Sequence, residues 1–135
     1  MLYGGSGQGQ GRAQIRASPV ETNTMIELPE KAPMKAFQSY VQVLEEMHGW
    51  TEVDLVHNCF LMGEEVGELF KAVRKMERMF DAPGAEVDRE AARAHVGEEI
   101  VDVLNYLLAI ANRLDIDVED AFRTKNALNQ TRTWT

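Results

Sequence analysis

Two segments of the chain, GEEVGELFKAV at 63–73 and GEEIVDVLNYL at 97–107, share one pattern of acidic and apolar residues. Each begins with Gly-Glu-Glu, continues with an apolar residue, and places another acid three residues after its second glutamate. Apolar residues recur in both segments at steps of three and four, which is the period of a helix with one buried face. The chain therefore repeats one acidic pattern on two helices that are both expected to contribute to the core.

The two acids of each segment lie on one flank of the apolar stripe, if each residue turns the helix by about 100°. These acids are Glu65 and Glu68 in the first segment and Glu99 and Asp102 in the second. If the two helices pack as an antiparallel pair, the four carboxylates meet in one cleft, and their repulsion then requires a proton or a cation. Oxygen ligands without an obligatory histidine suit Mg²⁺ better than Zn²⁺, with Mn²⁺ as the alternative metal. The four acids therefore predict a Mg²⁺ site.

Two other interpretations of these acids remain open. A solvated acidic face is the first, since most charged helix flanks simply face water. A di-iron carboxylate bundle is the second, but it expects Glu-x-x-His on each of two helices, and the chain does not carry that motif on two helices. His95, one turn before Glu99, is the nearest candidate ligand, and we interpret it as a partly buried histidine at the helix edge.

The chain from residue 34 onward follows a helical pattern throughout. Gly49 is expected to end the first helix, and Thr51 with Asp54 forms a capping signal for the second. Asp88 and Asp117 are the expected N-caps of the third and fourth helices. No segment alternates like a strand, so the fold class is all-α, an antiparallel helical bundle with short connections. The helices are expected over about 34–48, 52–80, 89–114 and 118–129.

Composition excludes several classes of function. The chain has 135 residues, enough for one domain, and its net charge of −8 disfavours nucleic acid or an anionic membrane as the main partner. No apolar run reaches the ~18–20 residues of a membrane span, and no signal-peptide core is visible. A cytoplasmic protein is the default expectation, and Cys59, the single cysteine, is expected to be a reduced thiol in the core.

The N-terminal part differs from the rest in composition. Residues 1–12 are rich in Gly and Gln and lack the apolar residues that a core needs. We therefore expect a flexible arm at 1–33 before a domain at 34–135. A chain that starts at Met25 is expected to keep its melting temperature.

The two acidic segments, followed by KNALNQTR at 125–132, resemble the all-α nucleoside triphosphate pyrophosphohydrolases of the MazG type, whose signature is Glu-Glu-x-x-Glu, a variable gap, and Glu-x-x-Asp. The resemblance runs from about Phe37 to Trp134. The gap here, residues 69–98, is 30 residues and long for the family, which puts the shape of the nearby pocket rim in question. The resemblance implies an enzyme that hydrolyses NTPs or dNTPs between the α- and β-phosphates, releasing the monophosphate and pyrophosphate, in the clearance of non-standard or surplus nucleotides.

The resemblance also assigns roles to individual residues. It makes the four acids metal ligands, with Glu65 or Glu68 as the catalytic carboxylate that orients the attacking water. The family's Lys…Asn…Arg run falls on three residues that would bind phosphate oxygens: Lys125, Asn129 and Arg132. Ordinary cations at a helix C-terminus are the alternative interpretation of that run.

The base pocket has candidates of its own. Trp50 occupies the position that stacks near the base in similar enzymes, with His48 beside it, and a core plug at a helix junction is the alternative. Asn105, one turn from the second acidic pair, is a candidate to hydrogen-bond the substrate or a ligand acid, unless it is a plain surface residue. Phe37 and Trp134 are further candidates.

Two alternatives to a broad house-cleaning enzyme stay open: a relative dedicated to dUTP, dCTP or phosphoribosyl-ATP, and a non-catalytic helical partner module on the same scaffold. One chain offers apolar surface on more than one side, so a homodimer or homotetramer is expected to complete the bundle. Similar proteins are dimers or tetramers whose base pockets a neighbour completes.

Overall fold

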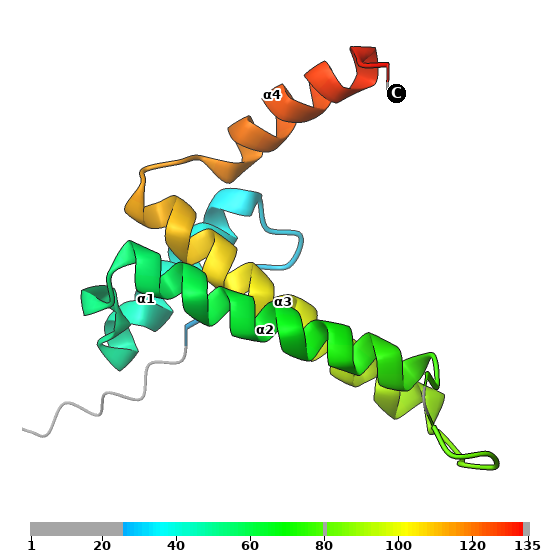
Figure 1. The fold of residues 1–135 in the computed structure, drawn as a ribbon. Helices are drawn as coiled ribbons and strands as arrows, with labels where there is room; N and C mark the ends of the chain where they lie inside the picture. Colours follow the sequence, from blue (N-terminus) through cyan, green and yellow to red (C-terminus); the bar gives the residue numbers. More distant parts are fainter. Residues whose placement is uncertain (1–25, 80, 134–135) are drawn as a thin grey trace, which may run out of the picture.

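The computed structural model describes residues 26–79 and 81–133, which fold into α-helices joined by short connections (Figure 1). The sequence-based expectations for residues 1–24 and for Trp134 lie outside this range. Within the described ranges there is no strand, which confirms the all-α fold class. The elements in chain order are α1 (Met34–His48), the 3₁₀ turn η1 (Trp50–Glu52), α2 (Leu55–Met76), α3 (Arg89–Arg113) and α4 (Val118–Thr131).

The C-terminus of α1 lies at the predicted position because of Gly49. This glycine has a φ of 70°, in the left-handed region that costs a residue without a Cβ little. Its N–H donates to the carbonyl oxygens of Glu45 and Glu46, which would otherwise have no partner at the helix end. This C-cap leads the chain directly into η1 and so determines the position of Trp50 relative to α1.

The limits of α2 differ from the predicted 52–80. Asp54 is the N-cap itself, and its carboxylate accepts from the N–H of His57 at 2.9 Å. Residues 50–52 form a separate 3₁₀ turn, so the predicted start is three residues too early. At the other end, Arg78 adopts a φ of 60°, and a left-handed residue cannot continue a right-handed helix. The helix therefore stops at Met76, although the apolar pattern in the sequence continues.

The N-caps predicted for α3 and α4 are confirmed. The Asp88 carboxylate accepts from the N–H groups of Glu90 and Ala91 at 3.1 Å each. The Asp117 carboxylate accepts from the N–H of Asp120 at 3.0 Å. Both caps satisfy amide groups that have no partner within the first helical turn.

The two long helices α2 and α3 run antiparallel, side by side, as a hairpin (Figure 1). At the end of the hairpin away from its connecting loop, α1 packs on α3 and forms a small core with α4. Val41, Leu108 and Ala109 are the buried centre of this core. No helix in the described part of the chain combines the length and apolarity that a bilayer crossing needs.

Gln38 of α1 connects the ends of α3 and α4. Its amide nitrogen donates to the carbonyl of Ile116 at 2.8 Å, and its amide oxygen accepts from the N–H of Val118 at 3.0 Å. Asn112 of α3 donates to the Gln38 carbonyl at 2.8 Å. These bonds hold the first turn of α4 against α1, while the rest of α4 projects away from the hairpin (Figure 1).

Much of the apolar stripe predicted for the second helix is exposed in the single chain. Phe60 is 73% exposed, and Cys59 is exposed as well, so the prediction of a core thiol is wrong. The periodicity was strong enough to predict an apolar face, but it cannot tell whether that face is covered by its own chain. Other large exposed apolar residues of α2 and α3 are Val56, Phe70, Val73, Ile100, Val101 and Leu107.

Candidate metal and nucleotide site

The two acidic segments meet across the α2–α3 hairpin. One carboxylate oxygen from each of Glu65, Glu99 and Asp102 lies within 4.8 Å of the others. Glu65 comes from α2 and the other two come from α3, so the cluster depends on the antiparallel register of the pair. Glu99 is only 8% exposed, which is rare for a glutamate unless a charge or a ligand compensates its burial. The structure thus brings together three of the four acids that the sequence singled out.

Burial and like charge act together on this cluster. Burial raises the pKa of Glu65 above its ordinary value of 4.5, and the negative charges of Asp102 and Glu99 raise that pKa further. Burial also raises the pKa of Tyr106, and the charge of Glu65 adds to the effect. Carboxylates in this state need either a proton or a cation. A set of oxygen donors alone fits a hard divalent ion such as Mg²⁺ or Mn²⁺.

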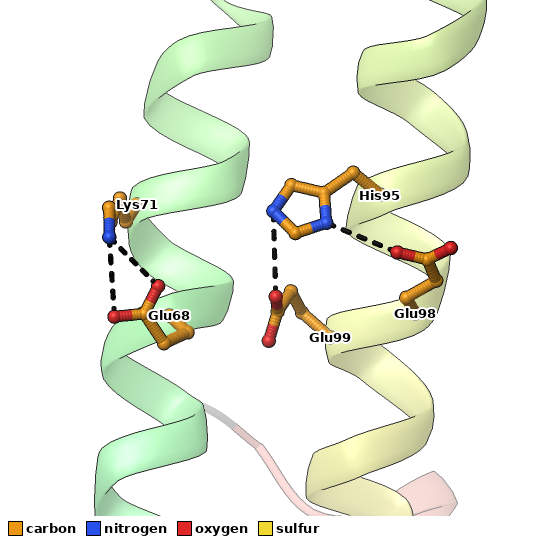
Figure 2. Close-up of polar contacts among 5 residues, drawn as sticks. All are labelled: Glu68, Lys71, His95, Glu98 and Glu99. Carbon is orange, nitrogen blue, oxygen red and sulfur yellow. Dashed lines mark hydrogen bonds and ion pairs between the residues drawn. The ribbon is translucent and has the colours of Figure 1, made fainter.

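Glu68, the fourth acid, is turned to a different partner. Its carboxylate forms an ion pair with Lys71 on the next turn of α2, with oxygen-to-Nζ distances of 3.0 and 3.4 Å (Figure 2). The ammonium group of Lys71 is a favourable partner for this exposed carboxylate. Its role as a fourth ligand therefore stays a prediction.

His95 lies beside Glu99 at the helix edge, but it is exposed, with 49% of its side chain accessible, so the expectation of a partly buried histidine is wrong. Its Nε2 is 3.5 Å from a carboxylate oxygen of Glu99, and its Nδ1 is 3.3 Å from Glu98 (Figure 2). Both partners follow on the next turn of α3, so one helix face holds all three. His95 thereby orients Glu99 and, when protonated, offsets part of the negative charge.

A cavity of about 370 Å³ extends from these acids toward α1 and η1. Glu65 and Asp102 line the cavity at the acidic end, and Trp50 lines it near η1. Asn105 and Tyr106 of α3 also line it. The structure therefore places two residues predicted for the base pocket, Trp50 and Asn105, in the same cavity as two predicted metal ligands.

Trp50 is half exposed, at 50%, which contradicts its interpretation as a core plug. Its indole stacks on the His48 imidazole with ring centroids 4.4 Å apart and an interplanar angle of 19°. Its carbonyl oxygen accepts a hydrogen bond of 2.9 Å from Arg113, which ties η1 to the end of α3. The result is an aromatic surface held at the cavity wall.

Sequence analysis missed two polar residues of the cavity wall, Glu45 and Asn58. They are 6% and 4% exposed. Asn58 lies seven residues before Glu65, which places both on one face of α2. Glu45 lies one turn after Val41 on the buried face of α1. In each case, a polar residue at a position where the helical pattern predicts a buried apolar one was the sequence feature that could have indicated a site residue.

The predicted phosphate-binding residues of α4 do not line this cavity. Helix α4 packs against α1 through its first turn, and the rest of it projects away (Figure 1). Lys125 and Asn129 belong to its later turns, and Arg132 is the C-cap that follows Thr131. Asn129 donates to Asn126 at 3.3 Å. Phe37 packs against the buried core instead of the cavity. The role of the α4 residues stays a prediction.

Comparison with known proteins supports the interpretation of the acidic segments. Residues 58–133 match the MazG nucleotide pyrophosphohydrolase domain, a range that includes both acidic segments and α4. The chain is also 31% identical over 91 residues to the uncharacterized protein YvdC of Bacillus subtilis (strain 168), an alignment that covers 64% of this chain and 82% of that protein. No solved structure gives a match. Since the family match spans more than half of the chain, this protein belongs to the MazG nucleotide pyrophosphohydrolase family.

Proposed function

We propose that this protein hydrolyses nucleoside triphosphates between the α- and β-phosphates, with Mg²⁺ or Mn²⁺, and so releases a nucleoside monophosphate and pyrophosphate. The observation that carries the proposal is that Glu65 and Asp102 belong both to the three-carboxylate cluster and to the wall of the cavity that contains Trp50. A metal-chelating triphosphate and an aromatic base have one continuous place to bind. The removal of non-standard or surplus nucleotides is the role that we assign to this reaction.

Glu65, Glu99 and Asp102 would hold the metal, with Glu68 joining them once it leaves Lys71. A divalent cation at this position supplies positive charge to the phosphates and lowers the pKa of water. Of the two carboxylates that the sequence singled out for this role, Glu65 is the better candidate to orient the attacking water, because it lies in the carboxylate cluster and at the cavity wall, whereas Glu68 pairs with Lys71. Burial of the carboxylates strengthens each of these electrostatic interactions.

The same geometry sets the direction of the substrate. With the phosphates at the acidic end, the base reaches the Trp50 end, where an indole supplies a stacking surface. Asn58 and Glu65 are seven residues apart on α2, which is about 10 Å along the helix axis. That separation is on the scale of a nucleoside, so base and phosphates can occupy opposite ends of the cavity together.

A homodimer or homotetramer is part of this proposal. The exposed apolar side chains of α2 and α3, such as Phe60 and Phe70, are too many and too large for a surface that stays in water. A two-fold assembly covers the same surface on both copies. It also offers Lys125 and Asn129 of α4, and Arg132 just after it, to the phosphates in a neighbouring chain's site.

The test is release of pyrophosphate from a panel of dNTPs and NTPs with Mg²⁺, with Mn²⁺ and with EDTA. Hydrolysis in isotopically labelled water identifies the attacked phosphorus, because the label enters the monophosphate or the pyrophosphate. Glu99→Gln should abolish release, whereas Glu98→Gln, a change of the same charge at an exposed neighbour, should leave it almost intact. Release of orthophosphate, or equal activity in both variants, would refute the proposal.

A further inference from the structure

The cavity wall near Trp50 is held together by a residue that does not itself line the cavity. Arg113, at the C-terminal end of α3, donates from its guanidinium to a Glu45 carboxylate oxygen at 2.9 Å and to the Trp50 carbonyl oxygen at 2.9 Å. With its amide oxygen turned toward Arg113, Asn58 accepts from both terminal guanidinium nitrogens at 3.2 Å, the orientation that the hydrogen-bond network favours. One side chain thus joins α1, η1 and α2 to α3.

These bonds stabilise polar groups of the wall that have left water. Glu45 and Asn58 are 6% and 4% exposed, and both line the cavity, whereas Arg113 is not among the lining residues. A buried carboxylate is costly unless it is paired and hydrogen-bonded, and a guanidinium, with its planar set of donors, can bind several acceptors in one fixed geometry. The effect of Arg113 on a ligand in the cavity therefore passes through the residues that it holds.

Trp50 depends on Arg113 for its position relative to α3. The turn η1 packs on α1, and the Trp50 indole stacks on the imidazole of His48 at the end of that helix. His48 is exposed and does not line the cavity, so this stack covers one face of the indole and fixes the ring only to the end of α1. The bond from Arg113 to the Trp50 carbonyl connects the turn to α3, the helix that carries Asp102 at the acidic end of the cavity.

We infer that Arg113 is a positioning residue for nucleotide binding, which holds the open face of the Trp50 indole at the cavity wall for the base to stack on. The inference rests on the proposed function only in taking the ligand to be a nucleotide. Arg113 is eleven residues after Asp102, or about 16 Å along α3, so a change at Arg113 should leave the carboxylate cluster in place. Loss of Arg113 should therefore weaken binding of the base without changing the metal chemistry.

The test is a double-mutant cycle on the full chain with Arg113→Lys and Trp50→Ala, measured as KM and kcat for hydrolysis of dNTPs. A lysine keeps the positive charge but loses the fork that reaches three partners. Arg113→Lys should raise KM by about tenfold, within the worth of one stacking contact, with kcat nearly unchanged. Trp50→Ala keeps the backbone carbonyl that Arg113 binds, so in that background Arg113→Lys should change KM by less than about twofold. Arg93→Lys, at an exposed arginine of α3, should leave KM unchanged.

Fluorescence provides a measurement that needs neither hydrolysis nor nucleotide. The chain has two tryptophans, so Trp134→Phe leaves Trp50 as the single tryptophan emitter. In that background, Arg113→Lys should lower the anisotropy of Trp50 emission, because the turn that carries the indole is no longer bound to α3. A merely structural role would lower the melting temperature and the fraction of active enzyme, but would leave the anisotropy of the folded protein unchanged and would act equally with and without the Trp50 ring.

The two proposals fail in different ways. If pyrophosphate is released and Arg113→Lys leaves KM or the anisotropy unchanged, or raises KM equally in both backgrounds, the positioning role is wrong and hydrolysis stands. If no dNTP is hydrolysed, but dNTPs quench Trp50 and do so more weakly in Arg113→Lys with its lower anisotropy, hydrolysis is wrong and the positioning role stands. If no nucleotide binds, both are wrong.

Melting curves identify loss of fold. If Arg113→Lys does not fold, Glu45→Gln takes its place in both measurements, because its amide oxygen still accepts from Arg113 but the bond loses the charge that strengthens it. A smaller rise in KM that vanishes in the Trp50→Ala background, with a lower anisotropy, would support the inference. An unchanged KM, or an equal rise in both backgrounds, would overturn it.

Discussion

Neutralising Glu65 should make the metal-free protein more stable while it removes the response to Mg²⁺. The Glu65→Gln change keeps the shape of the side chain but deletes one of three carboxylates that lie within 4.8 Å of one another. At that distance, repulsion between two unit charges is about 0.9 kcal/mol in bulk water and about 3.5 kcal/mol at an effective dielectric constant of about 20. Glu65 faces two such neighbours, Glu99 and Asp102.

Protonation limits how much of this repulsion the wild type can experience. At pH 7 a glutamate can take up a proton at a cost of roughly 3.7 kcal/mol, so the destabilisation that one carboxylate imposes cannot exceed this value. We therefore expect Glu65→Gln to raise the free energy of unfolding by about 1–3 kcal/mol in EDTA. For a chain of this size that is a rise in Tm of roughly 4–12 °C. The comparison requires a fixed protomer concentration, since assembly also shifts Tm.

Mg²⁺ should stabilise the two proteins to different extents. An ion that binds only the folded wild type stabilises it by about 2.7 kcal/mol at a hundred times its Kd. Glu65→Gln loses a charged ligand and should gain much less. Glu98→Gln, an exposed glutamate on α3, serves as the control and should respond like the wild type. Equal Mg²⁺ shifts in all three proteins, or an unchanged Tm of Glu65→Gln in EDTA, would refute the carboxylate site.

The stability of the metal-free protein should depend on pH in a defined direction. The pKa of Glu65 is raised in the folded protein, so the folded state holds a proton at pH values where the unfolded state has lost it. Stability of the metal-free wild type should therefore fall as pH rises from the ordinary value of 4.5 through the raised folded value. Urea titrations across this window should show a smaller fall for Glu65→Gln.

Three further changes test other parts of the structure. Trp50→Ala should raise KM by about 10- to 100-fold, as expected for a lost stacking contact of ~1–3 kcal/mol, with the Mg²⁺ dependence unchanged; an unfolded variant would show instead that Trp50 is structural. Phe60→Asp should reduce the molar mass in light scattering to that of a monomer, because it places a charge on the exposed apolar face; an unchanged mass would exclude this face as the contact. Gly49→Ala should lower stability by roughly 1–2 kcal/mol, the cost of a Cβ in the left-handed region, and an unchanged melting curve would show that the turn relaxes.

The sequence predicts the helices well where a residue imposes its own local geometry. Gly49, Asp88 and Asp117 each satisfy groups at a helix end through their own conformation or side chain, so the corresponding ends were predicted correctly. The start of α2 was wrong because Thr51 and Asp54 are both good caps, and only the three-dimensional path through η1 selects between them. Capping residues in the sequence therefore identify the positions where a helix can begin or end, and the tertiary structure determines which of these positions is used.

The acids were predictable for a different reason. Their spacing relative to the apolar stripe fixes their direction from each helix, so Glu65, Glu99 and Asp102 converge once α2 and α3 pair. Glu68 could not be placed in the same way, because a flexible exposed carboxylate takes the partner that is present, here Lys71. Asn58 was missed because its burial at the cavity wall comes from the packing of α2 on the other helices, which the sequence of α2 alone does not show.

The connection between α2 and α3 lies at the end of the hairpin opposite to α1 (Figure 1). The sequence had suggested that its length would alter the rim of the pocket, but Met76 is eleven residues beyond Glu65, or about 16 Å along the helix. The hairpin can therefore gain or lose turns at this end without moving any cavity residue. This loop is therefore a suitable place to insert a fluorescent reporter or an affinity tag.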